Sequence, residues 1–138
     1  MTKEEIQKLM VLVEQYKEQI NSLEYQNSYI QAAITDYNRA KMTLEKLGNE
    51  EKNTDLLLPI GGSSYIDAKA NDPSKVLFDI GSGYVIEKST EDSIKNIDKR
   101  IEDLQKSQEK VNAMIEQFQT EANNATMKAQ KLYQETNK

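Results

Sequence analysis

The chain has 138 residues, of which 37% are hydrophobic and 30% charged, and its formal net charge is −5. This length suggests one domain, residues 1–138, although the apolar fraction is low for a compact globule. Because the sequence contains neither Cys nor His, it excludes disulfides, thiol nucleophiles, Cys/His zinc sites and histidine general bases. The acidic charge argues against a nucleic-acid partner, since phosphate binding requires a basic face.

The N-terminal stretch MTKEEIQKLMVLVEQ carries acidic residues early and only a short apolar run, so we expect no signal peptide. No apolar stretch approaches the roughly 18 residues that span a bilayer. We therefore expect a cytoplasmic protein without a membrane partner.

Residues 3–48 are predicted to form a coiled-coil helix, which ends where Gly48 and Asn49 provide a stop signal. Most seam positions of six heptads are apolar or aromatic, which is typical of coiled coils. Position a is occupied by Ile6, Val13, Ile20, Asn27, Ile34 and Lys41, and position d by Leu9, Tyr16, Leu23, Ile30, Tyr37 and Leu44. Asn27 is interpreted as a polar residue that sets the register of the seam.

The segment from residue 56 to residue 88 is the β-like part of the chain and reads LLLPIGGSSYIDAKANDPSKVLFDIGSGYVIEK. Alternating apolar runs are separated by turn signals at Gly61-Gly62, at Asn71–Ser74 and at Gly81–Gly83, which predicts two β-hairpins. Two small hairpins are marginal alone and have free edges, so we expect several chains to close a shared β-barrel. The residues expected to mediate this oligomerisation are Leu58, Ile60, Tyr65, Ile66, Val76, Phe78, Ile80, Tyr84 and Ile86.

The glycines of this segment are read as hairpin turns and not as a phosphate loop. GSGYVI lacks the spacing of a dinucleotide fingerprint, and no Gly-Lys-Ser/Thr follows a glycine loop. We therefore expect no nucleotide, and more generally no cofactor and no metal.

Residues 90–136 are predicted to form a second coiled-coil helix, with an N-cap and acidic residues from Ser89 to Asp92. Position a is Ile94, Ile101, Gln108, Ile115, Ala122 and Ala129, and position d is Ile97, Leu104, Val111, Phe118, Ala125 and Leu132. Two seams of equal length joined by a β insert predict an antiparallel pair. This pairing places Asn27 near Gln108 and Val111, where the two polar seam residues could share hydrogen bonds.

The antiparallel pairing also brings the two ends of the chain together at a tip. The run Leu9–Val13 is apolar all round the helix, and a two-helix coil cannot bury Val11 at position f. The tip residues that we expect to bind apolar targets are Leu9, Met10, Val11, Leu12, Met127, Leu132 and Tyr133. Two interpretations remain open here, namely a frayed end whose side chains happen to be apolar and a flexible Met-containing patch for promiscuous targets.

The hairpin motifs resemble those of the α-type subunit of prefoldin, a family of archaeal and eukaryotic co-chaperones. One motif is carried by Leu58-Pro59-Ile60-Gly61 with Ser64-Tyr65-Ile66, and the other by Ile80-Gly81 with Gly83-Tyr84 and Ile86. The resemblance covers the whole chain, and two hairpins instead of one favour the α type.

The resemblance implies a mostly helical α+β fold and a non-enzymatic, ATP-independent chaperone subunit. Two such chains and four β-type chains would form a hexamer whose tips capture unfolded polypeptides and pass them to a group II chaperonin. The alternative is a structural protein of the same architecture, either filament-forming or an adaptor. A hydrolase is a poor third reading, because the many carboxylates lie on solvated helix faces.

Overall fold

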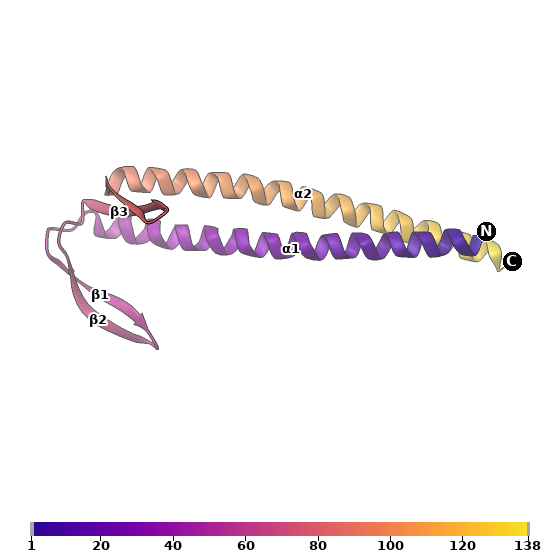
Figure 1. Ribbon diagram of the computed structural model, residues 1–138, viewed down its shortest axis with the longest axis horizontal. Coiled ribbons are helices and arrows are strands. Elements are labelled where there is room, and N and C mark those ends of the chain that lie inside the picture. The colour runs from indigo at the N-terminus through magenta and orange to yellow at the C-terminus, as the bar shows by residue number, and fades with distance from the viewer. Residues whose placement is uncertain (1, 138) are drawn as a thin grey trace. The chain divides into compact units, whose positions relative to one another are not determined.

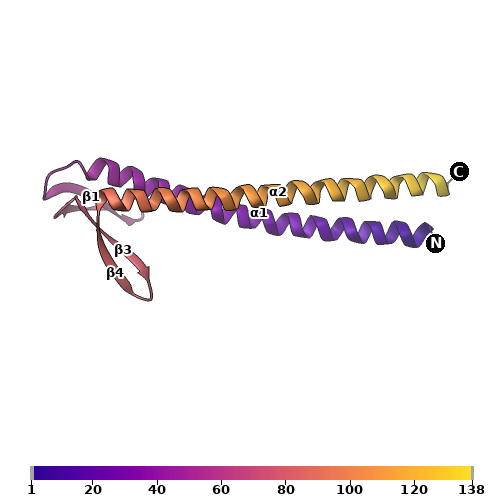
Figure 2. The same ribbon diagram turned by 90° about the horizontal axis from the view of Figure 1, so that it is seen from above.

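The computed structural model describes residues 2–137. Two helices flank four strands, in the order α1 (Thr2–Leu47), β1 (Thr54–Gly61), β2 (Ser64–Ala70), β3 (Lys75–Gly81), β4 (Tyr84–Ser89) and α2 (Thr90–Thr136). The strands form two separate two-stranded sheets, the β1–β2 hairpin, which is seen best in Figure 1, and the β3–β4 hairpin, which is seen best in Figure 2. The expected fold class, mostly helical with two antiparallel hairpins between long helices, is confirmed.

The chain divides into two compact units, which are described separately. The terminal unit combines the residues up to Ala33 with those from Leu104 onward, and therefore contains the first part of α1 and the last part of α2. The hairpin unit comprises Ile34–Asp103 and contains both hairpins with the helix segments next to them.

The helices bury the side chains that the heptad pattern assigns to the seam. The buried apolar side chains of the two helices all occupy position a or d, namely Val13, Ile34, Ile97, Ile101, Val111, Ala122, Ala125 and Ala129. A two-helix pair can cover only one stripe of each helix, which is why so few apolar residues suffice for this fold.

Helix α1 ends and helix α2 begins at residues with specific capping roles. The Gly48 amide donates to the Leu44 carbonyl oxygen at 2.8 Å, and a Cβ on Gly48 would lie 2.7 Å from the Thr90 methyl carbon. At the start of α2, the Ser89 hydroxyl oxygen accepts from the Asp92 amide at 3.1 Å, which confirms the expected N-cap. Glycine at position 48 thus lets the end of α1 approach the start of α2.

Each hairpin turns through two residues with positive φ, Gly62 and Ser63 in the first and Ser82 and Gly83 in the second. Positive φ at both turn residues matches the right-handed twist of the strands. The first hairpin begins at Thr54, two residues before the expected segment 56–88, because Thr54 pairs with Ala70 and Asp55 with Lys69. The residues Asn49–Asp55 therefore include the start of a strand as well as a linker.

The loop between the hairpins is fixed to the start of α2. The Thr90 amide donates to the Ser74 carbonyl oxygen at 2.8 Å, and its hydroxyl donates to the Pro73 carbonyl oxygen at 2.6 Å. The Asp72 carboxylate accepts from the Ser74 hydroxyl and amide, and these hydrogen bonds lower the pKa of Asp72. Within residues 2–137, no helix is both long enough and apolar enough to cross a membrane.

Candidate functional site

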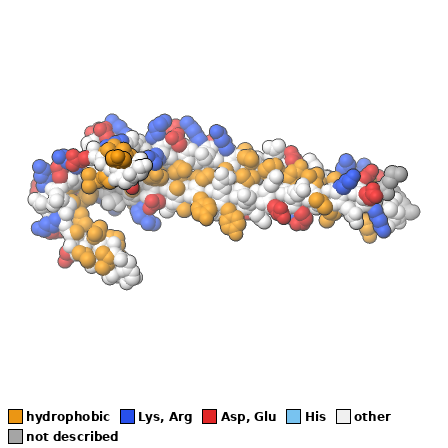
Figure 3. Space-filling view, in the orientation of Figure 1, with side chains coloured by type: hydrophobic (Ala, Val, Ile, Leu, Met, Phe, Trp, Pro, Cys, Tyr) orange, Lys and Arg blue, Asp and Glu red, His pale blue; other side chains and the backbone are white. Residues whose placement is uncertain are grey.

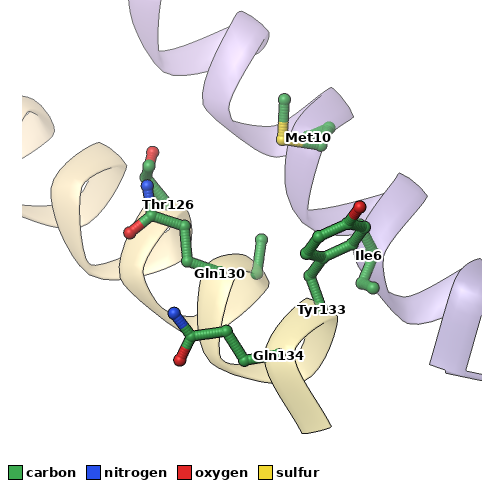
Figure 4. Close-up of a pocket in the computed structure, with 7 residues that line it drawn as sticks. Ile6, Met10, Thr126, Gln130, Tyr133 and Gln134 are labelled. Carbon is green, nitrogen blue, oxygen red and sulfur yellow. The ribbon is translucent and has the colours of Figure 1, made fainter. Parts of the chain in front are cut away.

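The terminal unit carries an open groove between α1 and α2 near the ends of the chain. Ile6 and Met10 line it from α1, and Thr126, Ala129, Gln130, Tyr133 and Gln134 line it from α2. Figure 4 shows the Tyr133 ring pointing from α2 toward Ile6, with Met10 one turn further along α1. Met10 is 50% exposed and Tyr133 is 62% exposed, so the groove presents apolar side chains to solvent.

The structure brings together only part of the expected tip set. Met10 and Tyr133 line the groove, whereas Val11 and Met127 are exposed outside its lining. Leu9 and Leu132 are half-buried in the seam, as their d positions require, and Leu12 is also half-buried. The heptad explains this division, because positions e of antiparallel helices share one flank, and Met10, Thr126 and Tyr133 all occupy e.

Near the groove, the side chains that α2 contributes to the seam are small. Ala122, Ala125 and Ala129 are buried on α2, and further along the seam the rings of Tyr16 and Phe118 lie 5.8 Å apart. A hydrogen bond to the Glu121 carboxylate raises the pKa of Tyr16. Alanine side chains fill little volume, so the groove above Ala129 stays open to solvent.

A layer of four amide side chains crosses the seam of the terminal unit. The Asn27 amide nitrogen donates to the Asn112 Oδ1 at 2.6 Å, and the Gln108 amide nitrogen donates to the Gln31 Oε1 at 3.0 Å. The sequence suggested that the two polar seam residues, Asn27 and Gln108, bond to each other, and this prediction is wrong. Each of them pairs instead with an e residue of the opposite helix. The Asn27 Oδ1 is buried and lacks a hydrogen-bond partner within residues 2–137.

The hairpin unit exposes a second apolar surface, on the outer parts of both hairpins. In the first hairpin, Leu58 pairs with Ile66, and both side chains are about half exposed, at 51% and 52%. Four further residues of the predicted oligomerisation set are also exposed, Ile60 and Tyr65 in the first hairpin and Ile80 and Tyr84 in the second. This surface, defined by the exposed apolar residues of strands β1–β4, is called the hairpin surface below.

One face of the second hairpin is partly covered within its own unit. Val76, Phe78 and Ile86 are half-buried, and β3 shares a groove with Tyr37, Ala40 and Leu44 of α1. Phe78 pairs with Ile86 across the strands, and the Lys88 ammonium lies 5.8 Å from the centre of the Phe78 ring. Ile80 does not follow Val76 and Phe78 into this groove, because the strand register shifts between Asp79 and Gly81.

Sequence reasoning missed several exposed apolar residues. Leu57, Leu77 and Val85 belong to the hairpin surface, with exposures of 63%, 72% and 57%. Their alternation with Leu58, Phe78 and Ile86 was a signal for a second face. Tyr25 and Tyr29, on α1, are also strongly exposed and were not singled out.

Polar contacts join the helices of the hairpin unit beside its apolar seam. Lys41, at position a, forms an ion pair with Asp98 at 2.7 Å, and this hydrogen bond raises the pKa of Lys41. Arg100 donates to the Tyr37 hydroxyl at 3.2 Å and lies 5.9 Å from the centre of its ring. Residues 2–137 hold no group of three or more Asp or Glu side chains placed to bind a metal ion.

The family described as "Prefoldin subunit" matches residues 16–135. A prefoldin subunit alpha of Methanosarcina barkeri is 26% identical over 136 residues, covering 96% of this chain and 94% of the relative. One from Methanoculleus marisnigri is 32% identical, covering 94% and 86%, and prefoldin subunit 5 of Pongo abelii is 29% identical, covering 79% and 71%.

Among solved structures, a chain of filamentous PFD from Methanocaldococcus jannaschii shares the fold, with a TM-score of 0.71. The alignment covers 83% of this chain and 95% of that chain, at 21% sequence identity. Both the helices and the arrangement of strands between them are therefore typical of a known architecture.

Proposed function

The chain belongs to the prefoldin family, and from that premise we propose that it is an α-type subunit of an ATP-independent chaperone that captures unfolded polypeptides. Family membership supports a role in protein folding, and the curated relatives named prefoldin subunit alpha support the α type. The observation that carries the capture mechanism is the open apolar groove beside Met10 and Tyr133. The proposed client-binding set remains Leu9, Met10, Val11, Leu12, Met127, Leu132 and Tyr133.

One contact between the groove and a client should be weak. Full burial of one large apolar side chain contributes roughly 1.5–3 kcal/mol, whereas association costs at least about 4 kcal/mol in lost freedom. A single tip therefore holds a client only briefly. Several tips of one assembly acting on the same polypeptide give useful avidity while each contact still releases readily. Met10 suits this role, because its flexible side chain adapts to clients of different shape.

Assembly would be provided by the hairpin surface. Its exposed apolar residues and the free edges of two-stranded sheets favour association with other chains. We propose that the hairpins join a β-barrel shared with β-type subunits, in a hexamer of two α-type and four β-type chains in the cytoplasm. Transfer of the client to a group II chaperonin completes the proposed activity, for which the chain needs no enzymatic chemistry.

The test compares two matched pairs of tip residues in the assembled complex. Met10→Ser with Tyr133→Ser removes the two large exposed apolar side chains of the groove lining, and Val11→Ser with Met127→Ser removes two side chains of similar exposure outside it. We expect the groove variant to lose most of its suppression of aggregation of a chemically unfolded protein, measured by light scattering. The variant outside the groove should lose less, and both should keep the mass of the complex.

If neither variant changes the suppression of aggregation, the tip is a frayed end and the capture mechanism is wrong. If the unaltered complex does not suppress aggregation at all, the adaptor reading takes its place.

A second candidate function is that of a filament subunit. The free strand edges of the two-stranded sheets favour it, because such edges can also add chains without closing a ring, and the chain described as filamentous shares this fold. Sedimentation at rising concentration separates the two functions, because an open filament grows without limit and a hexamer keeps one mass.

A further inference from the structure

Two tyrosines stand exposed on α1 within the terminal unit, away from the groove. Tyr25 is 72% exposed and Tyr29 is 77% exposed, the highest value among the large apolar side chains of residues 2–137. They occupy positions f and c of the heptad, one helical turn apart, so both rings lie on the outer side of α1. Figure 3 shows hydrophobic side chains projecting from the α1 side of the helix pair.

The residues of α1 nearest in sequence to this aromatic pair include acidic but no basic side chains. Between residues 18 and 38 the sequence contains Glu18, Glu24 and Asp36 but no Lys or Arg. None of these three carboxylates forms an ion pair with another residue of the described range 2–137, whereas Glu14 and Glu45 lie near lysines. Negative charge and aromatic faces are thus available together on one part of the helix surface.

A shallow depression places a carboxylate directly beside one of the rings. It is lined by Asn21, Glu24, Tyr25 and Ser28. The Ser28 hydroxyl donates to the backbone carbonyl oxygen of Glu24 at 3.1 Å, so it does not occupy the Glu24 carboxylate. An incoming guanidinium group could pair with this carboxylate and stack on the Tyr25 ring at the same time.

We propose that Tyr25, Tyr29 and Glu24 form a docking surface for an arginine-bearing helical segment of a partner protein. Arginine fits better than lysine, because its planar guanidinium both stacks on aromatic rings and binds carboxylates through two hydrogen bonds. The one-turn spacing of the tyrosines matches basic residues one turn apart on a second helix lying along α1. The acidic surroundings repel nucleic acid and anionic lipid, and unfolded clients carry no fixed charge pattern.

The probe is a short amphipathic helical peptide with arginines one turn apart, and its twin has glutamine in their place. Fluorescence anisotropy would measure the binding of each labelled peptide to the native assembly. We expect the arginine peptide to bind about tenfold more tightly than its twin, and each of Glu24→Gln and the pair Tyr25→Ser with Tyr29→Ser to remove that preference. The control is Met42→Ser, which changes an exposed apolar side chain of α1 outside both the groove and the proposed surface and should leave the preference for the arginine peptide unchanged.

Equal binding of the two peptides to the native assembly would overturn the proposal, and so would an unchanged preference for the arginine peptide in the Tyr25→Ser with Tyr29→Ser variant. Two further readouts distinguish other occupants of the surface. A lower mass of the Tyr25 and Tyr29 variant would assign the surface to contacts between copies, and a loss of aggregation suppression would assign it to clients. Either result would replace the docking proposal, and neither depends on whether the groove captures clients.

Discussion

Lys41 is the one charged side chain at a seam position of the helix pair, and its partners explain how it is tolerated there. Its ammonium group lies 2.7 Å from the Asp98 carboxylate on α2 and 3.9 Å from that of Glu45 on α1. The hydrogen bond to Asp98, with smaller charge contributions from Asp98 and Glu45, raises the pKa of Lys41 above its ordinary value. The stem of the lysine can cover the seam while its charged end reaches these carboxylates.

The raised pKa fixes the sign of a pH dependence. The folded state holds the proton of Lys41 more tightly than the unfolded state, so the pair stabilises the fold fully below pH 10.5 and loses this effect above it. We expect Lys41→Gln to be less stable than the natural chain at neutral pH, with the difference in unfolding free energy closing above pH 10.5. Urea denaturation followed by circular dichroism measures this difference.

The matched control is Lys69→Gln, whose ion pair with Asp55 is longer, at 3.8 Å, and more exposed. It should change stability little at either pH, because exposed ion pairs contribute little. A stability gap for Lys41→Gln that stays constant up to the most alkaline pH would contradict the assignment.

Gly48 illustrates a residue whose lack of a side chain matters more than its conformation. Because a Cβ would meet the Thr90 methyl carbon at 2.7 Å and the Leu44 carbonyl oxygen at 2.8 Å, we expect Gly48→Ala to destabilise the fold by about 1–3 kcal/mol. Thr90→Ser removes the methyl group but keeps the hydroxyl that binds Pro73. In the Thr90→Ser background, thermal denaturation should therefore show a smaller loss from Gly48→Ala. Equal losses in both backgrounds would exclude the contact with Thr90 as the cause.

At the level of whole elements, the amide layer is the main interruption of the apolar seam in the terminal unit. Asn27 donates one hydrogen bond to Asn112, but its own Oδ1 is buried and has no partner among the residues that the structure describes. An unsatisfied buried carbonyl costs roughly 1–3 kcal/mol, so this layer reduces stability. What it can provide in return is a fixed register, because sliding either helix would bury the amides against apolar side chains.

This account predicts opposite effects for the two members of one hydrogen bond. Asn27→Leu removes the buried carbonyl and leaves the exposed Asn112 to water, so we expect the unfolding free energy to rise by about 1 kcal/mol. Asn112→Ala leaves the Asn27 amide without its acceptor, so we expect a loss of about 1 kcal/mol. Urea denaturation of the two variants under identical conditions measures both changes in unfolding free energy. Changes of the same sign would show that the Asn27–Asn112 hydrogen bond does not determine the stability of the amide layer.

The amide layer also marks the limit of what the sequence could predict about the helices. The heptad identified the seam, because a repeat of seven residues specifies which side of each helix faces its partner. It could not identify Asn112 and Gln31 as hydrogen-bond partners, because these e residues flank the seam and their side-chain conformations decide the contact. The tip set, by contrast, was predicted as a group of apolar residues at one end of the pair, although the heptad positions of Met10 at e and Val11 at f already separate the side chain that lines the groove from the one that does not.

For the whole molecule, the two hairpins differ in how much of their apolar surface their own chain covers. In the second hairpin, the half-buried Val76 and Phe78 line a groove shared with α1, and Leu77, which lies at the same groove, remains 72% exposed. The strand pattern was read for one apolar face in each hairpin, and the apolar residues of the other face, Leu57, Leu77 and Val85, were missed. It could not say which face packs on the helices, because both carry apolar residues and the choice depends on contacts distant in sequence.

Adjacent residues of β3 should therefore separate assembly from folding. Leu77→Ser changes an exposed side chain, so we expect it to lower the mass of the complex in sedimentation while the thermal stability of the isolated chain stays within about 0.5 kcal/mol. Phe78→Ser instead removes a half-buried ring that pairs with Ile86 and contacts Lys88, so it should destabilise the isolated chain itself.

If Leu77→Ser assembles normally, the exposed face of the second hairpin is not an interface, and association must depend on the first hairpin, where Leu58 and Ile66 are exposed. Leu58→Ser then becomes the variant that must lower the mass, because two-stranded sheets with uncovered apolar faces are not stable in water on their own.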